Sequence, residues 1–186
     1  MSLQIYMGPM FAGKSSTIIR LVNRYKSIGK TICLVTYAGD TRYNDDLYLW
    51  NHDALKIPCE RWTELNSHRL ENTFTEANIV IIDEAQFFPD LKQFVEFAVE
   101  TSGKHVIIVG LDGDADRKPF GQLLDCIPLA DDVFKLKSFC RLCSDGTEAL
   151  FSYCTKKKTE QVQVGGADLY MPLCRKCFLR ETKSQV

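Results

Sequence analysis

The strongest chemical signal in the chain is a glycine-rich segment near its start. The segment matches the pattern G-x4-G-K-[S/T], and it lies between an apolar run and an amphipathic one. Its residues are Gly8, Pro9, Met10, Phe11, Ala12, Gly13, Lys14 and Ser15. Glycines let the backbone wrap a phosphate, and the N-terminus of the following helix adds partial positive charge. Lys14 would then reach the β- and γ-phosphates of ATP, and the Ser15 hydroxyl would bind Mg²⁺. The alternative is a glycine-rich turn before an ordinary helix.

A second signal is a pair of carboxylates at the end of an apolar run. Ile79–Ile82 predicts a buried strand, and Asp83 and Glu84 follow it directly. Active sites of parallel α/β sheets form at this edge, and successive residues leaving a strand point in different directions. We therefore expect Asp83 to face Mg²⁺, directly or through water, and Glu84 to act as general base on a hydroxyl or on water. The alternative is a solvated acidic turn.

A third signal is a set of paired cysteines near the end of the chain. Four of the eight cysteines form two Cys-x-x-Cys pairs, Cys140 with Cys143 and Cys174 with Cys177. Two such pairs separated by roughly thirty residues suit a tetrahedral Cys₄ zinc site, whose closed shell makes the metal structural. A redox role is the weaker alternative. The remaining cysteines are expected to be small buried hydrophobes, namely Cys33, Cys59, Cys126 and Cys154.

Composition limits the classes of function. The chain has 186 residues, of which 45% are hydrophobic, and its formal net charge is −1. A charge this close to zero offers no electrostatic reason for nucleic acid as a partner. Apolar runs stay well short of the roughly 20 residues that span a bilayer, and the first residues do not resemble a secretory signal. We expect a cytoplasmic protein with neither a membrane nor a nucleic-acid partner.

The elements that must position these residues alternate between strand and helix. Strands are predicted at 3–7, 31–37, 78–82, 105–111 and 133–137, and helices at 14–27 and 91–99. This order predicts an α/β fold, a P-loop NTPase (RecA-like) parallel sheet flanked by helices, with a small C-terminal zinc-binding lobe. We place the α/β domain at 1–138, the zinc lobe at 139–180, and a short tail at 181–186.

Weaker features lie in predicted loops. Arg42 lies in the segment 40–43, which follows a strand. Its planar guanidinium group could bind a phosphate, or it could form a surface salt bridge. The stretches 114–118 and 156–158 are expected to be solvated loops. No histidine shows metal or triad spacing.

Four blocks of the sequence together resemble the cytosolic-type (type II) thymidine kinases. They are the glycine loop 8–15, the segment Asp40-Thr41-Arg42-Tyr43, the segment 83–90 that begins Asp-Glu-Ala-Gln-Phe-Phe, and Gly165-Gly166-Ala167-Asp168-Leu169-Tyr170. Their order matches the family, as do the terminal cysteine pairs, and the resemblance covers the chain from the glycine loop to about Cys177.

The resemblance implies transfer of the γ-phosphate of ATP to the 5′-hydroxyl of thymidine or deoxyuridine, in nucleotide salvage. It assigns Glu84 as the base, Lys14 and Arg42 as catalytic cations, and a homotetramer as the assembly. Beyond the glycine loop, it places Asp40, Thr41, Arg42, Asp83 and Gln86 at the nucleotide. The nucleoside would be held by Met10, Phe87, Leu111, Ala115, Gln161, Val162, Gln163, Val164, Gly165 and Tyr170, partly through main-chain atoms of a closing loop.

One departure from the family concerns the wall of the nucleoside pocket. Relatives commonly carry an aromatic residue where this chain has Ala115, so stacking area is lost and room is left. Tyr43 or Phe120 could fill the space instead.

The main rival reading is a P-loop ATPase whose zinc lobe binds nucleic acid. The near-neutral charge and the lack of interleaved basic and aromatic residues speak against it.

Overall fold

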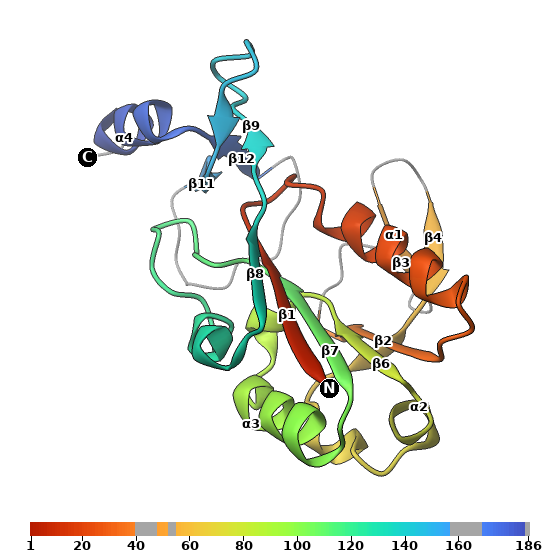
Figure 1. The fold of residues 1–186 in the computed structure, drawn as a ribbon. Coiled ribbons are helices and arrows are strands. Elements are labelled where there is room, and N and C mark those ends of the chain that lie inside the picture. Colours follow the sequence, from red (N-terminus) through yellow and green to blue (C-terminus); the bar gives the residue numbers. More distant parts are fainter. Residues whose placement is uncertain (40–47, 52–54, 157–168, 185–186) are drawn as a thin grey trace.

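The computed structural model describes residues 1–39, 48–51, 55–156 and 169–184. Six strands form a wholly parallel sheet in the order β5-β2-β6-β7-β1-β8 (Figure 1). In chain order these strands are β1 (Ser2–Met7), β2 (Ile32–Tyr37), β5 (Glu60–Trp62), β6 (Ile79–Ile82), β7 (His105–Gly110) and β8 (Asp132–Lys135). The predicted α/β class with a parallel sheet is confirmed.

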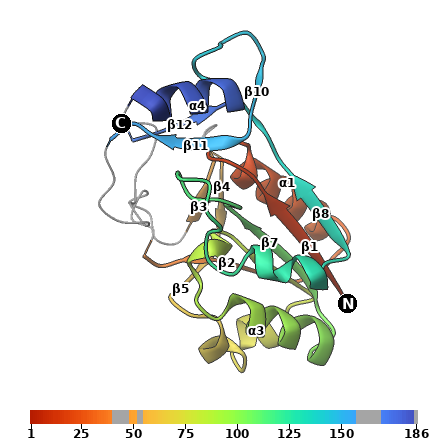
Figure 2. The same ribbon diagram turned by 90° about the vertical axis from the view of Figure 1, so that its left-hand side faces the viewer.

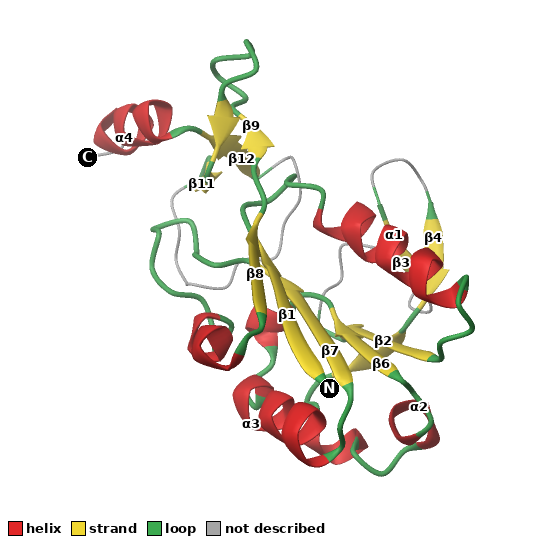
Figure 3. Ribbon diagram, in the orientation of Figure 1, coloured by secondary structure: helices red, strands yellow, loops and turns green. Residues whose placement is uncertain are grey.

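Both faces of the sheet are buried at its centre, where the side chains of β6 and β7 point alternately to opposite faces, whereas the edge strand β8 is exposed. In β7, Val106 and Ile108 join one hydrophobic core, whereas Ile107 and Val109 join the other. Helix α1 (Lys14–Lys26) covers the second face, and α3 (Leu91–Glu96) covers the first (Figure 3). Parallel strands buried on both faces read as continuous apolar runs, which is why these strands were predictable.

Helix α1 forms because its apolar residues recur at helical spacing. Ile18, Leu21 and Val22 are buried as predicted, and the neighbouring Ile19 is buried with them. The helix ends just before Gly29, whose φ of 72° lies in the left-handed region that stops a helix. The phosphate-loop end of α1 is therefore fixed by packing of its second and third turns.

Several short elements were not predicted. Strands β3 (Tyr48–Trp50) and β4 (Lys56–Pro58) pair with each other, and three-residue β5 adds an edge to the sheet. The short helices are η1 (Asn66–His68), α2 (Asn72–Thr75), η2 (Ala85–Phe87) and η4 (Leu124–Leu129). Helix α3 continues into a π-helical turn, η3 (Phe97–Thr101), so the predicted helix extends slightly further than expected.

The C-terminal segment forms a small lobe at the carboxyl end of β1 (Figure 2). We call residues 138–156 and 169–184 the cysteine lobe. It contains β9 (Ser138–Phe139), β10 (Glu148–Ala149), β11 (Phe151–Cys154), β12 (Tyr170–Leu173) and α4 (Arg175–Ser184). Helix α4 extends beyond residue 180, so the proposed tail at 181–186 begins inside the helix. In the described ranges no helix is both long and apolar enough to cross a membrane.

Candidate active site

The phosphate loop lies at the carboxyl edge of the sheet, between β1 and α1. Its base is fixed by neighbouring strands, because the Gly8 N–H donates to the Gly110 carbonyl across 3.2 Å. A Cβ at Gly8 would lie 2.5 Å from the Leu136 carbonyl oxygen, so this position accepts only glycine. Gly13 and Phe11 both have positive φ, 75° and 63°. The loop therefore curves back on itself, as a phosphate cradle requires.

Lys14 points into the curve of this loop. Its Nζ donates to the carbonyl oxygens of Pro9 at 2.8 Å and Gly8 at 3.3 Å. Ser15 is half-buried in the first turn of α1, next to backbone N–H groups that a helix start leaves unpaired within the helix. The ammonium, the hydroxyl and the helix N-terminus thus suit an anionic ligand together with its Mg²⁺.

Asp83 and Glu84 leave β6 at the same edge of the sheet. Both are largely buried, at 6% and 9% exposure. The Asp83 N–H still bonds to the Val35 carbonyl at 2.8 Å, whereas Glu84 adopts a left-handed conformation with a φ of 51°. This turn separates the directions of the two side chains. Non-glycine residues with such backbone strain cluster at functional sites.

Gln86 links Glu84 to the end of β7. Its Nε2 donates to Oε2 of Glu84 at 2.6 Å, and its Oε1 accepts the Leu111 N–H at 2.9 Å. The side chain is 3% exposed, and a Cβ at Gly110 would lie 2.4 Å from its Oε1. Gln86, predicted at the nucleotide, therefore contacts the carboxylate and the β7 turn within the protein.

An apolar cluster lies between the phosphate loop and the cysteine lobe. Ala115, Cys154, Leu169 and Tyr170 are buried together, and Met10 of the phosphate loop packs against them. Three predicted nucleoside residues thus meet, namely Met10, Ala115 and Tyr170. Sequence reasoning missed Cys154 and Leu169 as members. Leu169 belongs to the block 165–170, which was a signal for it, but only the fold brings Cys154 to this place.

The loop after β7 differs from the solvated loop expected for residues 114–118. Asp114 is 6% exposed, and its Oδ1 accepts the N–H groups of Asp116 at 2.8 Å and Lys118 at 2.9 Å. The carboxylate thus closes the turn instead of facing water. Arg117 places its guanidinium 4.8 Å from the ring centre of Phe178 in the cysteine lobe. The expectation was wrong for Asp114 and Ala115, which are buried, whereas Asp116, Arg117 and Lys118 are exposed as expected. Charge pattern alone does not reveal the local pairing of Asp114.

Phe87 packs in an aromatic row rather than beside Ala115. Its ring centre lies 5.3 Å from that of Tyr37 and 5.3 Å from that of Phe120. Phe120 is therefore engaged with Phe87. Cys154, Leu169 and Tyr170 surround Ala115 instead.

Some predicted residues lie outside the described part of the chain. They are Asp40, Thr41, Arg42 and Tyr43, and Gln161, Val162, Gln163, Val164 and Gly165 of the closing loop.

The four paired cysteines come together in the cysteine lobe. Their Sγ atoms all lie within 4.8 Å of one another, and none forms a disulfide. Cys143 Sγ lies 3.8 Å from Cys174 Sγ and 3.5 Å from Cys177 Sγ. A tetrahedron with Zn–S bonds of about 2.3 Å places sulfur atoms about 3.8 Å apart. The cluster therefore fits zinc, as the spacing predicted.

Ionisation of all four thiols depends on a cation. Burial raises the pKa of Cys140, but backbone N–H groups of Cys174, Cys143 and Leu142 lower it to about 6. The hydrogen bond between Cys177 and Cys143 instead raises the pKa of Cys177 to about 12. Four thiolates this close repel one another, so a divalent cation is needed for all four to ionise.

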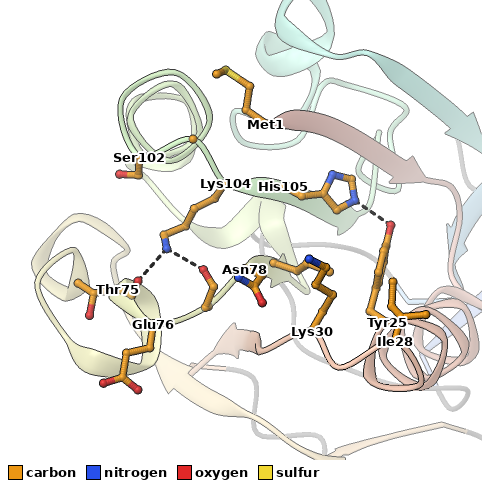
Figure 4. A pocket seen from close by; sticks show the side chains of 13 residues that line it. Met1, Tyr25, Ile28, Lys30, Thr75, Glu76, Asn78, Ser102, Lys104 and His105 are labelled. Atoms are coloured by element: carbon orange, nitrogen blue, oxygen red, sulfur yellow. Dashed lines mark hydrogen bonds between the residues drawn. The ribbon is translucent and has the colours of Figure 1, made fainter.

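A hollow of about 580 Å³ lies at the opposite, amino edge of the sheet (Figure 4). Lys104, one of the lining residues, is buried, and its ammonium donates to the carbonyls of Thr75 at 3.1 Å and Ala77 at 2.7 Å. His105 Nε2 is hydrogen-bonded to the Tyr25 hydroxyl at 2.9 Å. These side chains join α2 and α1 to β7, which is a structural role away from the phosphate loop.

Comparison with known proteins decides the family. The thymidine kinase family model matches residues 1–178. The chain belongs to the thymidine kinase family. A thymidine kinase of Oryza sativa subsp. japonica is 40% identical over 181 residues, covering 95% of this chain and 66% of the relative. Thymidine kinase a of Arabidopsis thaliana is 38% identical, covering 96% and 75%.

Viral members of the thymidine kinase family match over nearly their whole length. The thymidine kinase of Vaccinia virus (strain Western Reserve) is 38% identical over 177 residues, covering 95% of this chain and 96% of the relative. The chain thus spans just under two thirds of the rice relative but almost all of the viral one.

Proposed function

We propose that the chain is an ATP-dependent nucleoside kinase that transfers the γ-phosphate of ATP to the 5′-hydroxyl of thymidine or deoxyuridine. The observation that carries the proposal is the apolar cluster described above. It joins Met10 of the phosphate loop to Tyr170 of the cysteine lobe. A flat apolar ligand held there lies beside the phosphate cradle, as an acceptor nucleoside must.

The phosphate loop binds the donor in this proposal. Lys14 exchanges its contacts with the Pro9 and Gly8 carbonyls for the β- and γ-phosphates, and the N–H groups at the start of α1 hold phosphate oxygens. Ser15 and Asp83 would hold Mg²⁺, which neutralises charge on the phosphates when bound. We propose Arg42 as a further cation at the transferring group.

Glu84 acts as the general base. Gln86 holds its carboxylate through the 2.6 Å hydrogen bond, so the oxygen that accepts the 5′-hydroxyl proton is already oriented. Burial keeps bulk water from competing as the acceptor of the phosphoryl group. The rest of the pocket is formed by Phe87 and Leu111, with the segment 161–165 closing over the base.

Zinc at the four cysteines has a structural role in this proposal. It stabilises a lobe whose own apolar core is small and whose strands carry Tyr170 and Cys154 into the pocket.

We divide the chain into an α/β nucleotide-binding unit, 1–138, and a zinc-binding unit, 139–180. We also expect a homotetramer and a cytoplasmic location. Light scattering of the purified chain tests the homotetramer.

A direct assay tests the proposed reaction. The purified chain is incubated with ATP, Mg²⁺ and each common nucleoside, and nucleoside monophosphate is measured. We expect product with thymidine and deoxyuridine. The rival ATPase reading is not favoured by the family assignment. It would gain support if these nucleosides gave no product while single-stranded DNA stimulated ATP hydrolysis.

A variant tests the role of Glu84. Glu84→Gln keeps the size of the side chain but removes the proton acceptor, so kcat should fall about 10²- to 10⁴-fold while ATP binding persists. Glu100→Gln, on an exposed residue of η3, is the matched control and should keep full activity. Full activity of Glu84→Gln would exclude Glu84 as the base.

A further inference from the structure

The phosphate loop is hydrogen-bonded to the cysteine lobe. The backbone N–H of Met10 donates to Oγ of Ser152 across 2.9 Å, although the two residues are 142 positions apart in the chain. Ser152 lies on β11 and is 5% exposed, so little water competes for this bond. In a phosphate loop the backbone N–H groups hold the ligand, and a side chain that fixes the direction of the backbone acts on their geometry.

The position of this bond matters because the next residue is strained. Phe11 has a φ of 63°, a conformation that non-glycine residues keep only where the surroundings hold them. The bond from Met10 fixes the Pro9–Met10 peptide, one residue before Phe11. At the other end of the loop, Gly13 leads into the packed helix α1. Ser152 thus adds a contact from the cysteine lobe to a loop whose two ends are fixed by β7 and α1.

Ser152 is also close in the chain and in the sheet to the metal ligands. It faces Pro172 in the antiparallel pairing of β11 with β12, and Leu173 leads directly into Cys174. The Arg141 N–H, inside the first cysteine pair, donates to the Pro172 carbonyl at 3.0 Å. Both cysteine pairs are therefore tied to the strand segment that sets the position of Ser152.

Arg117 attaches the lobe to the α/β part at a second place. Its guanidinium lies 4.8 Å from the ring centre of Phe178 and 5.7 Å from that of Phe151. Phe178 follows Cys177, and Phe151 precedes Ser152. Because the Met10 bond, Arg117 and the apolar cluster at Ala115 all join the lobe to the α/β part, we expect a displacement at the cysteines to alter the Met10 bond.

We propose that Ser152 is a positioning residue through which metal binding at the four cysteines orients the phosphate loop for ATP. The inference rests on the proposed function, because it requires ATP at the loop and zinc at the cysteines. Coupling between two binding sites is reciprocal. Zinc therefore strengthens ATP binding, and ATP strengthens zinc binding by the same factor.

The test uses the zinc-loaded full chain and three substitutions. Ser152→Ala removes the acceptor hydroxyl, and Ser152→Thr keeps it. Thr155→Val is the matched control, because its hydroxyl donates to the Leu169 carbonyl at 3.0 Å within the lobe and not to the phosphate loop. The dissociation constant of ATP is measured by calorimetry without nucleoside. The dissociation constant of zinc is measured by equilibrium competition with a coloured chelator, with and without ATP.

We expect Ser152→Ala to weaken ATP binding about fivefold, the change that corresponds to one hydrogen bond of roughly 1 kcal/mol. ATP should strengthen zinc binding by the wild type and by Thr155→Val but not by Ser152→Ala. Ser152→Thr should restore both properties.

Two outcomes separate this inference from the proposed function. If the wild type binds no ATP, the proposed function fails and the inference with it. If the wild type binds ATP but Ser152→Ala binds it equally well, and ATP still strengthens its zinc binding, the inference alone is overturned. Should Ser152→Ala not fold, the wild type decides the question by itself, because an equal zinc affinity with and without ATP contradicts the coupling.

Discussion

Gln86 offers the sharpest test of the site, because one buried side chain holds both the candidate base and the turn after β7. Gln86→Ala removes the 2.6 Å bond to Glu84 and the 2.9 Å bond from the Leu111 N–H. A hydrogen bond to a charged group contributes about 1.5–3 kcal/mol, and an N–H left without a partner costs about 1–3 kcal/mol. Because such terms are not additive, we expect the free energy of unfolding to fall by about 2–4 kcal/mol.

The same substitution should reduce kcat more than it reduces ATP affinity. Misplacement of a catalytic group by an ångström costs on the order of 100-fold in rate. We therefore expect kcat with thymidine to fall about 10- to 100-fold. The dissociation constant of ATP should stay close to that of the wild type, because the Gln86 amide is hydrogen-bonded to Glu84 and Leu111.

Urea unfolding followed by tryptophan fluorescence measures the stability, since Trp62 is 3% exposed and reports on the core. Gln93→Ala is the matched control, because exposed Gln93 accepts a bond from Asn66 Nδ2 at 2.8 Å away from the site. The reasoning is refuted if Gln86→Ala unfolds like the control and keeps its kcat. Weaker ATP binding with unchanged kcat would instead make Gln86 a nucleotide ligand, as the family resemblance implies.

Three further predictions concern the pocket wall, the amino edge and the metal. Ala115→Phe adds a ring among Met10, Cys154 and Tyr170. We expect this ring to raise the ratio of kcat/KM for thymidine to kcat/KM for a bulkier analogue about tenfold. An unchanged ratio would contradict this packing. Burial lowers the pKa of His105, so the unfolded chain takes up the proton first as pH falls. The free energy of unfolding should therefore decrease below about pH 6.5, and less so in His105→Gln, as urea unfolding at pH 7.5 and 5.5 will show; parallel losses in both proteins would rule out His105 as the cause. Removal of zinc by a chelator should expose β9–β12 to hydrogen exchange before β1 and β7, and simultaneous loss of protection would argue against a structural metal confined to the lobe.

The parts of the fold that could be predicted are those specified by neighbouring residues. The apolar run 79–82 indicates a buried strand whatever surrounds it, and the glycine loop needs only a strand before it and a helix after it. The metal cluster was predictable in the same way, because each Cys-x-x-Cys pair consists of neighbouring residues. Three-residue strands such as β5 have no pattern of their own and exist only because β2 offers an edge to pair with.

The rest of the site depends on contacts between distant segments. Cys154 was predicted as a buried hydrophobe, but only the fold shows that it lies beside Ala115. Asp114 was expected in water, yet two N–H groups of its own loop satisfy its carboxylate and allow its burial. Gln86 belongs to a recognised block, but its bond to Glu84 depends on the left-handed turn at Glu84, which the sequence did not indicate.

The bond between Met10 and Ser152 also has a consequence for how the protein is made. A ribosome releases the phosphate loop first, and the strand that holds it emerges 142 residues later. At synthesis rates of about 5–20 residues per second, the nascent loop therefore waits roughly 7–28 s for its partner. During that interval β1, β6 and β7 can already assemble, whereas the loop cannot yet take its final shape. A chain interrupted before Ser152 would then carry a formed sheet and every residue of the glycine motif, yet a phosphate loop that lacks its bond to the cysteine lobe.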